Sequence, residues 1–455
     1  MKNGIRCGVI EGFYGRPWSV PQRERMIDLL ATWKLNTFLC SPKDEPNHRI
    51  YWQEPFSDLA LAKIRNLVDR GANIGVDVGT SLSPGLTLEY SNPDHLDSQL
   101  HRLTQLSAIG CSLVGIFLDD IPGELQTEED KRKFSSIVDA QLYFTNSLYE
   151  KALSQGISME FIVCPTQYHG IGNEEYISTF GSGLNQNLKL MWTGRQICSP
   201  TLTYSDAQIL EKSTKHQPFY WDNYPVNDVA MTYQLHIGPL RGRDPEIIAN
   251  MSGYLANPME LFESSLIPLR TMADFFNNPD AYDPDKSWNA AVNEFFAMKL
   301  ERDAFHHFGR TVQDSCLNGD ASPDVSMVLN RAAFLWRTKD SLGASGILNS
   351  LSSEIAAHSR TLLAQEFTLK DLQSEIRPWV VKYQMGGQVI DYLAQMLSEN
   401  PNFEDVGRNE ESVRSLTHLL SELHSNRYRV FGDHLEMLLS DLIDELEWAI
   451  ERIEK

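Results

Sequence analysis

Positive charge is scarce in this chain of 455 residues, which carries 40 Lys and Arg residues against 61 Asp and Glu residues and a formal net charge of −21 at pH 7. Proteins that bind a nucleic-acid backbone need a basic surface, and proteins that dock on anionic membranes need basic clusters. The sequence therefore predicts neither a nucleic acid nor a membrane as a partner. It leaves the oligomeric state open.

Long apolar runs and cysteine motifs are also missing. No segment is apolar over the roughly 20 residues that span a bilayer, and no signal-peptide core precedes the first strand-like segment. The six cysteines lack the spacings of zinc sites, and four of them lie in or beside apolar runs. We therefore expect reduced thiols and a cytoplasmic location. His169 and His236 have no third ligand at a telling spacing, so we expect neither a metal nor another cofactor.

The first part of the chain, residues 1–276, alternates short apolar runs with longer amphipathic stretches. The strand candidates are the ranges 7–10, 37–40, 74–78, 113–118, 161–164, 188–192, 219–221 and 253–256. Helix-like segments between them include 22–33, 59–69, 95–109, 129–153 and 206–216. Strand and helix alternating eight times are typical of a (β/α)8 TIM barrel, which we expect to be the catalytic domain.

The pattern changes after the turn-rich stretch 277–285. Beyond it, apolar residues recur at helical spacing opposite polar faces, in the ranges 288–308, 325–336, 372–397, 412–423 and 430–453. This pattern predicts an all-α helical bundle domain over residues 277–455, with turns at 317–323 and 399–404. We find no catalytic constellation in this second domain.

Two adjacent carboxylates, Asp119 and Asp120, follow the fourth strand candidate directly, and Pro122-Gly123 breaks the chain just after them. In a barrel of this kind, the loops after the strands carry the chemistry. Two neighbouring carboxylates repel each other, which favours keeping one protonated, as a general acid requires. An isolated Asp-Asp pair is more often an acidic turn or a helix cap.

Polar side chains also follow the other strand candidates. They comprise aromatic rings, amides, one carboxylate and one lysine, together with a glycine that permits close approach of a ligand: Gly12, Lys43, Tyr168, Trp221, Asn223, Asp228 and Asn257. Rings stack on the apolar face of a sugar, while amides and acids bind its hydroxyls. Phosphate chemistry would want a glycine-rich nest and paired cations, which are missing. The set predicts a site for a neutral polyhydroxylated ligand.

At these residues the sequence resembles glycoside hydrolase family 84, the β-N-acetylglucosaminidases that include protein O-GlcNAcases. The matching pieces occur in the family's order and span the predicted barrel: 8–18, Ser41-Pro42-Lys43-Asp44, 117–121, Cys164-Pro165-Thr166 with Tyr168, Trp221-Asp222-Asn223 and Asn257-Pro258. Each piece alone is weak, whereas six in order are specific. The helical part resembles the region that follows the barrel in this family, with far less specific motifs.

The resemblance implies a retaining, exo-acting enzyme that removes terminal β-linked GlcNAc, including GlcNAc on Ser or Thr, through an oxazoline formed by the substrate's own acetamide. It implies that Asp119 orients the acetamide by accepting its N–H. Asp120 would protonate the leaving oxygen and later deprotonate water. Tyr168 and Asn223 would hydrogen-bond around the acetamide, and Trp221 would form an apolar wall.

The resemblance also assigns the sugar hydroxyls. The Gly12 carbonyl and the Lys43 ammonium would meet the 3-hydroxyl, and Asp228 and Asn257 would hold the 4- and 6-hydroxyls. Gln167 departs from the family pattern, which often has Glu at that place, and this change could alter the local charge without removing any of these contacts.

Other interpretations of the same residues stay open. Lys43 could be a surface lysine or the Schiff-base lysine of an aldolase-type barrel. Tyr168 and Trp221 could be barrel-rim packing, and Asn223 and Asn257 could be turn residues. At the level of the whole protein, the alternatives are an endo-acting, hyaluronidase-like glycosidase and a glycan-binding barrel without turnover.

Overall fold

The computed structural model describes residues 5–313, 315, 317, 323–432 and 434–453. These residues group into two compact units that alternate along the chain. The first unit holds the chain up to Val229, Leu240–Phe262 and Leu269–Asp283, and the second holds Ala230–Pro239, Glu263–Pro268 and the chain from Pro284 onward. The division into domains 1–276 and 277–455 stays a prediction, because compactness does not show which segments fold independently.

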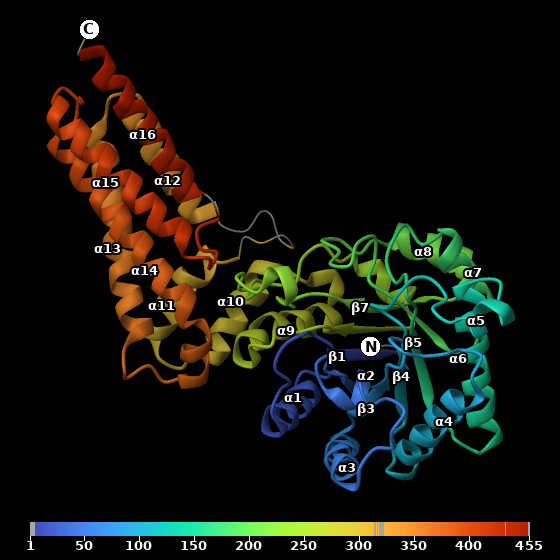
Figure 1. Ribbon diagram of the computed structural model, residues 1–455. Helices are drawn as coiled ribbons and strands as arrows, with labels where there is room; N and C mark the ends of the chain where they lie inside the picture. The colour runs from blue at the N-terminus through green and yellow to red at the C-terminus, as the bar shows by residue number, and fades with distance from the viewer. Residues whose placement is uncertain (1–4, 314, 316, 318–322, 433, 454–455) are drawn as a thin grey trace. The chain divides into compact units, whose positions relative to one another are not determined.

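The first unit is a closed barrel of parallel strands in which each strand pairs with the next and β8 returns to β1 (Figure 1). The strands are β1 (Arg6–Glu11), β2 (Thr37–Cys40), β3 (Asp77–Leu82), β4 (Leu113–Phe117), β5 (Glu160–Cys164), β6 (Lys189–Trp192), β7 (Pro218–Asp222) and β8 (Gly253–Ala256). The predicted (β/α)8 barrel is confirmed. All eight strands are parallel, so their carboxyl ends meet on one face, where a barrel carries its site.

Helices connect the strands of this unit. They are α1 (Val20–Thr32), α2 (Pro46–Arg49), α3 (Asp58–Ile74), α4 (Pro93–Ala108), α5 (Glu128–Lys133), α6 (Ile137–Ser154), α7 (Glu175–Gly183) and α8 (Tyr204–Thr214). Helix α9 (Phe262–Asn277) follows β8, and its residues Glu263–Pro268 belong to the second unit. Local sequence fixes several of their starts: Ser19 and Gln22 form a capping box at α1, and Ser57 caps α3. Such caps satisfy backbone N–H groups that a helix leaves free, each typically stabilising by about 1 kcal/mol.

The third strand was predicted too early in the chain. Residues 74–78 were expected to form it, but α3 continues to Ile74 and β3 is Asp77–Leu82. Gly75 ends α3 with a left-handed φ of 78°. The strand was missed because its second half is polar: Thr80 donates to the Cys40 carbonyl, and Ser81 bonds Ser41 across to the β2 end. Interstrand hydrogen bonds of this kind compensate the burial of hydroxyls that the apolar-run criterion rejects.

The helix predicted at 129–153 is two helices, α5 and α6. Between them Phe134 takes an extended conformation, and Ser136 starts α6 by accepting from the Asp139 N–H. A serine before an apolar run is a helix-start signal, and the prediction passed over it because the apolar spacing continues across the break.

The second unit contains α10 (Pro284–Phe295), α11 (Lys299–Thr311), α12 (Pro323–Arg337), α13 (Ser341–Leu363), α14 (Lys370–Glu399), α15 (Val406–Ser425) and α16 (His434–Ile453). The predicted helical region after the barrel is confirmed. The long helix α13 was not predicted, because its Gly- and Ser-rich sequence has weak intrinsic helix propensity. Cys316 and most of the turn predicted at 317–323 lie outside the described residues.

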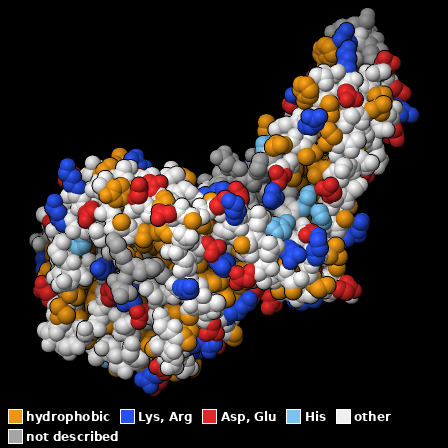
Figure 2. Space-filling model, turned by 180° about the vertical axis from the view of Figure 1, so that it is seen from behind, with side chains coloured by type: hydrophobic (Ala, Val, Ile, Leu, Met, Phe, Trp, Pro, Cys, Tyr) orange, Lys and Arg blue, Asp and Glu red, His pale blue; other side chains and the backbone are white. Residues whose placement is uncertain are grey.

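One apolar cluster joins residues from most of the barrel strands. It comprises Ile10, Leu39, Leu113, Phe117, Ile162, Cys164, Met191, Phe219, Trp221 and Leu255, with Tyr168 packed against it. Among the described residues, no helix combines the length and apolar character needed to cross a bilayer. On the face shown in Figure 2, acidic and basic side chains of the described residues are interspersed.

Candidate active site

The strand ends bring the predicted site residues to one face of the barrel. Gly12 follows β1, Lys43 follows β2, Asp119 and Asp120 follow β4, and Tyr168 follows β5. The residues from the last two strands are Trp221 on β7, Asn223 and Asp228 after β7, and Asn257 after β8. Hydrogen bonds and ion pairs join all nine positions into connected networks around Asp120 and Asn223.

Asp119 forms a buried ion pair with Lys43. The Lys43 ammonium donates to Asp119 Oδ2 and lies 4.0 Å from Asp120 Oδ2. It also lies 5.1 Å from the centroid of the Trp221 ring, within cation–π range. Burial alone would lower the pKa of Lys43, but the charges of Asp119 and Asp120 outweigh burial and raise it. A lysine held charged in this way is a poor Schiff-base nucleophile, which disfavours the aldolase interpretation.

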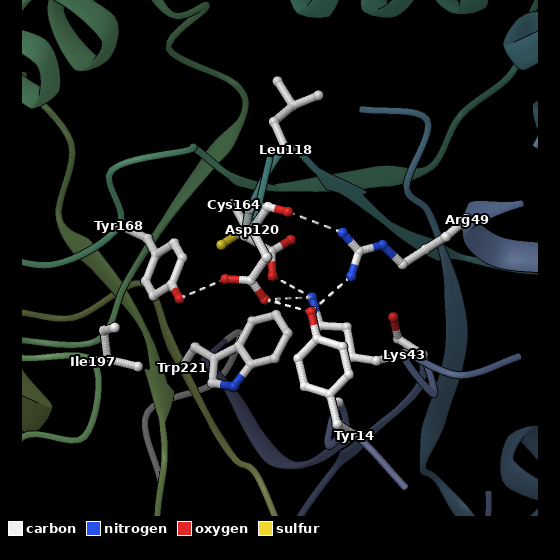
Figure 3. Close-up of polar contacts among 12 residues, drawn as sticks. Tyr14, Lys43, Arg49, Leu118, Asp120, Cys164, Tyr168, Ile197 and Trp221 are labelled. Atoms are coloured by element: carbon white, nitrogen blue, oxygen red, sulfur yellow. Dashed lines mark hydrogen bonds and ion pairs between the residues drawn. The ribbon is translucent and has the colours of Figure 1, made fainter. Parts of the chain in front are cut away.

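Asp120 has different neighbours from Asp119. Tyr14 donates to its Oδ2 at 2.8 Å and Tyr168 donates to its Oδ1 at 2.9 Å (Figure 3). The Asp120 side chain is 34% exposed, whereas that of Asp119 is 6% exposed. Burial and the Asp120 charge raise the pKa of the Tyr168 phenol, so Tyr168 remains an O–H donor. The more accessible carboxylate of the pair is therefore the one held between two phenols.

The backbone of Asp120 is strained and is tied to a residue that the sequence did not single out. Its φ is 54°, in the left-handed region that side-chain-bearing residues rarely occupy. Arg49 donates to the Asp120 carbonyl at 3.1 Å and to the Tyr14 hydroxyl at 2.7 Å. Arg49 comes from the short helix α2 rather than from a strand end, so no strand-end pattern could have found it. Tyr14 stood inside a matched motif but received no role.

An amide network forms a second part of the site. Asn223 Oδ1 accepts from Trp221 Nε1 and from Asn257 Nδ2, both at 2.9 Å. Asn223 Nδ2 donates to the Ile197 carbonyl at 2.8 Å, and Asn257 Oδ1 accepts from the Gly12 N–H at 3.2 Å. These bonds fix which end of each amide faces outward. They also link the ends of β1, β7 and β8, so Asn223 and Asn257 do more than form local turns.

Gly12 and Asp228 close the arrangement. A Cβ at position 12 would lie 2.5 Å from Trp221 Cζ2, so only glycine allows the chain to pass beside the indole. Asp228 accepts from the Tyr14 N–H at 2.8 Å, and burial raises its pKa. Asp228 is thereby brought to the β1 loop, although 214 residues of sequence separate it from Tyr14.

The remaining acids of the matched motifs have structural partners. Glu11 is fully buried and binds the Arg23 guanidinium through both carboxylate oxygens, at 2.6 and 2.8 Å. Asp222 binds Arg243 in the same bidentate manner and also accepts from the Tyr254 hydroxyl. Paired in this way, Glu11 and Asp222 hold strand ends rather than face the site.

Known proteins resemble this chain over most of its length. A family described as beta-N-acetylglucosaminidase matches residues 7–310. Protein O-GlcNAcase from Rattus norvegicus and that from Mus musculus are each 33% identical over 363 residues, or 78% of this chain. The chain spans only 38% of the length of these two relatives.

Solved structures also resemble this chain. A mutant O-GlcNAc hydrolase from Thermobaculum terrenum superposes with a TM-score of 0.92 and 30% identity, covering 98% of this chain and 96% of that one. CpGH84B, at 23% identity, has the same fold with a TM-score of 0.82, covering 96% of this chain and 76% of that one. The family match covers well over half of the sequence and includes all of the barrel strands except Arg6, the first residue of β1. The chain belongs to the β-N-acetylglucosaminidase family.

Proposed function

We propose that this protein is a retaining exo-β-N-acetylglucosaminidase that hydrolyses terminal β-linked GlcNAc through an oxazoline intermediate. The observation that carries the proposal is the contrast between two adjacent carboxylates: Asp119 is buried against a lysine, and Asp120 is accessible between two tyrosines. A retaining glycosidase with its own nucleophile needs a second carboxylate across the sugar, roughly 5 Å from the first. Substrate-assisted enzymes instead place one acid on the substrate amide and the other on the leaving oxygen.

Asp119 would act on the acetamide. Its carboxylate, held in place by the ion pair with the Lys43 ammonium, would accept the acetamide N–H and stabilise the positive charge of the forming oxazoline. Holding the acetamide oxygen near the anomeric carbon also replaces a bimolecular attack by an intramolecular one, which is worth several kcal/mol.

Asp120 would act on the leaving group and on water. Its two oxygens accept the phenol O–H bonds of Tyr14 and Tyr168, which would hold the carboxylate in place as the general base when water attacks the oxazoline. In the first step Asp120 must carry a proton instead, so one of the two tyrosine hydroxyls must turn away and leave an oxygen facing the glycosidic bond. The hydrogen bonds that Asp120 accepts from Tyr168 and Tyr14 would thus differ between formation of the oxazoline and its hydrolysis.

The other predicted residues would bind the sugar. Trp221 offers an apolar wall, and Asn223 and Tyr168 lie beside it to hydrogen-bond the acetamide. For the ring hydroxyls we keep the assignments made from the resemblance: Gly12 and Lys43 to the 3-hydroxyl, Asp228 and Asn257 to the 4- and 6-hydroxyls. The burial of Asn257 and Lys43 makes strong, water-excluded hydrogen bonds available to a neutral sugar.

The proposed substrate class is GlcNAc on Ser or Thr of proteins, or GlcNAc-capped glycans. This rests on the names of the relatives, which are called protein O-GlcNAcase and O-GlcNAc hydrolase. A cytoplasmic location stays part of the proposal, supported by Cys7, Cys40, Cys111 and Cys164, which are buried thiols outside any disulfide. We propose no cofactor for the reaction.

The test compares aryl β-glycosides that differ only at the 2-position. The 2-acetamido substrate should be hydrolysed with retention of anomeric configuration, seen by ¹H NMR of the first-formed product, and the 2-hydroxy substrate should be essentially inert. Because the amide oxygen is the proposed nucleophile, fluorinating the acetamide methyl should slow the reaction progressively. Equal turnover of the 2-hydroxy glycoside, or an inverted product, would overturn the proposed mechanism.

A further inference from the structure

A hollow of about 390 Å³ opens beside Asp120. It is lined by Tyr14, Lys43, Asp44, Glu45, Pro46, Arg49, Ile50, Leu86 and Asp120. Three of these residues, Tyr14, Lys43 and Asp120, also belong to the proposed sugar site, whereas Trp221, Asn223, Asp228 and Asn257 do not line the hollow. The hollow therefore adjoins the proposed proton donor, and Lys43 is the one residue proposed to bind the sugar that also lines it.

Helix α2 and the loop after β3 form the wall of the hollow that carries Ile50 and Leu86. Helix α2 is anchored by the bonds of Arg49 to Tyr14 and to the Asp120 carbonyl. The loop after β3 packs against the residue that follows Asp120: a Cβ on Gly85 would lie 2.7 Å from Ile121 Cγ2. Each element presents an aliphatic side chain, Ile50 at 68% exposed and Leu86 at 47% exposed. Both positions are thus fixed relative to the acid.

We propose that this hollow receives the leaving group, and that Ile50 and Leu86 select substrates whose glycosylated Ser or Thr has apolar neighbours. This inference rests on the proposed function, because it takes Asp120 as the proton donor. A donor must lie within hydrogen-bond reach of the glycosidic oxygen, so the atoms beyond that oxygen enter the space next to Asp120. There, contact with an apolar side chain would remove two exposed aliphatic surfaces from water.

Charge in the hollow disfavours an acidic neighbour. Its lining carries three carboxylates, Asp44, Glu45 and Asp120, against the cations Lys43 and Arg49, and the Lys43 ammonium is paired with Asp119. The Arg49 guanidinium donates to the Tyr14 hydroxyl and to the Asp120 carbonyl. Asp44 accepts from the Gly15 N–H at 2.7 Å, which holds its carboxylate in place. An aspartate beside the glycosylated residue would meet like charge, whereas an aliphatic residue would meet Ile50 and Leu86.

The experiment uses three glycopeptides that carry GlcNAc on one serine and differ only in the two flanking residues, which are Leu, Gly or Asp. We expect the Leu peptide to exceed the Gly peptide in kcat/KM by roughly fivefold to tenfold, and the Asp peptide to be the poorest. The double variant Ile50→Ser with Leu86→Ser should lose the Leu advantage and keep its rate on the Gly peptide. Both side chains are exposed, so the double variant is expected to fold.

The matched control is Leu153→Ser, which changes an equally exposed leucine (49%) near the end of α6 and should leave the Leu preference intact. Equal rates on the Leu and Gly peptides, hydrolysis of aryl glycosides with none of the peptides, or a preference that survives the double variant would each overturn the inference. Failure of the proposed function looks different, because the wild-type protein would then also fail to hydrolyse an aryl β-GlcNAc with retention.

Discussion

At the scale of single residues, the environment separates two identical side chains. Asp119 and Asp120 are consecutive, yet one is buried against Lys43 and the other stands between Tyr14 and Tyr168. Both carboxylates lie near the Lys43 ammonium, but the Asp120 side chain is 34% exposed and the Asp119 side chain only 6%. The division of labour proposed for the pair follows from this difference in exposure, because a proton donor must be reachable and an orienting carboxylate need not be.

Replacing the proposed proton donor should make the rate depend strongly on the leaving group. For Asp120→Ala we expect kcat/KM for a poor leaving group to fall by about 10²- to 10⁴-fold, and that for an activated aryl glycoside to fall far less, because activated groups depart without protonation. Steady-state kinetics on a series of aryl glycosides of graded phenol acidity measures this. Equal losses across the series would argue against the acid role.

Arg49 is expected to act as a positioning residue for Asp120. In Arg49→Met the Asp120 carbonyl and the Tyr14 hydroxyl each lose a donor, so the carboxylate should shift and kcat should fall by roughly 10- to 100-fold with little change in KM. Added guanidinium should restore part of the rate, which a variant with merely damaged structure would not allow.

Arg16→Met is the matched control for Arg49→Met. Arg16 comes from the β1 loop, but its side chain is 82% exposed and lies 3.8 Å from Glu260. A surface pair of this kind contributes little, so near wild-type kinetics are expected. Comparable losses in the two variants would mean that the positive charge, and not the Asp120 contact, matters.

At the scale of elements, the helical unit depends on small residues where α13 meets α14. A Cβ on Gly387 of α14 would lie 2.5 Å from Ile355 Cγ2 of α13. Small side chains at such a crossing let two helices approach closely, which adds dispersion contacts along both. The Gly and Ser residues of α13 itself give that helix a weak intrinsic propensity. Helix α13 therefore owes its stability to packing rather than to its local sequence.

Two glycine-to-alanine changes in this helix pair should have opposite effects. Gly387→Ala puts a methyl group into Ile355 and should lower the free energy of unfolding by about 1–3 kcal/mol. Gly346→Ala on α13 meets nothing within 4 Å and should raise it by up to about 1 kcal/mol, because alanine favours the helix. Urea unfolding followed by circular dichroism measures both. Equal shifts of the midpoint would show that the crossing tolerates the methyl group.

At the scale of the whole molecule, stability should depend on pH through Glu375. This side chain on α14 accepts the N–H groups of Glu263 and Ser264, at 3.0 and 2.8 Å, and burial raises its pKa to about 7. The folded state thus holds the proton more tightly than the unfolded state does. The protonated Glu375 side chain therefore stabilises the folded state fully below the ordinary pKa of about 4.5. This contribution to the free energy of unfolding is lost as pH rises toward and through 7.

Glu375→Gln should therefore flatten the decline in thermal stability between pH 5 and pH 8, because Gln cannot ionise. Melting temperatures of the full chain at intervals across this range measure the effect. Glu366→Gln, which removes the same charge from an exposed position, should keep the wild-type pH profile. If the Glu375→Gln profile coincides with the wild-type profile, Glu375 does not titrate in this window.

The sequence by itself determined the barrel, the helical character of the region after it, and the strand ends at which polar residues stand. These features are local: apolar runs, helical spacing and breakers are set by neighbouring residues along the chain. Asp119 and Asp120 could be predicted as candidates because they follow a buried strand directly, and parallel strands send all their carboxyl ends to one face.

Only the tertiary structure decided which side chains touch. Closing the barrel brings Arg49 to Asp120 and Tyr14 to Asp228 across large separations in sequence, and no local pattern encodes such pairs. The polar half of β3 and the Gly- and Ser-rich helix α13 went unrecognised for a related reason. Their hydroxyls and small side chains are stabilised by partners from other elements, and tertiary contacts of this kind override local propensity.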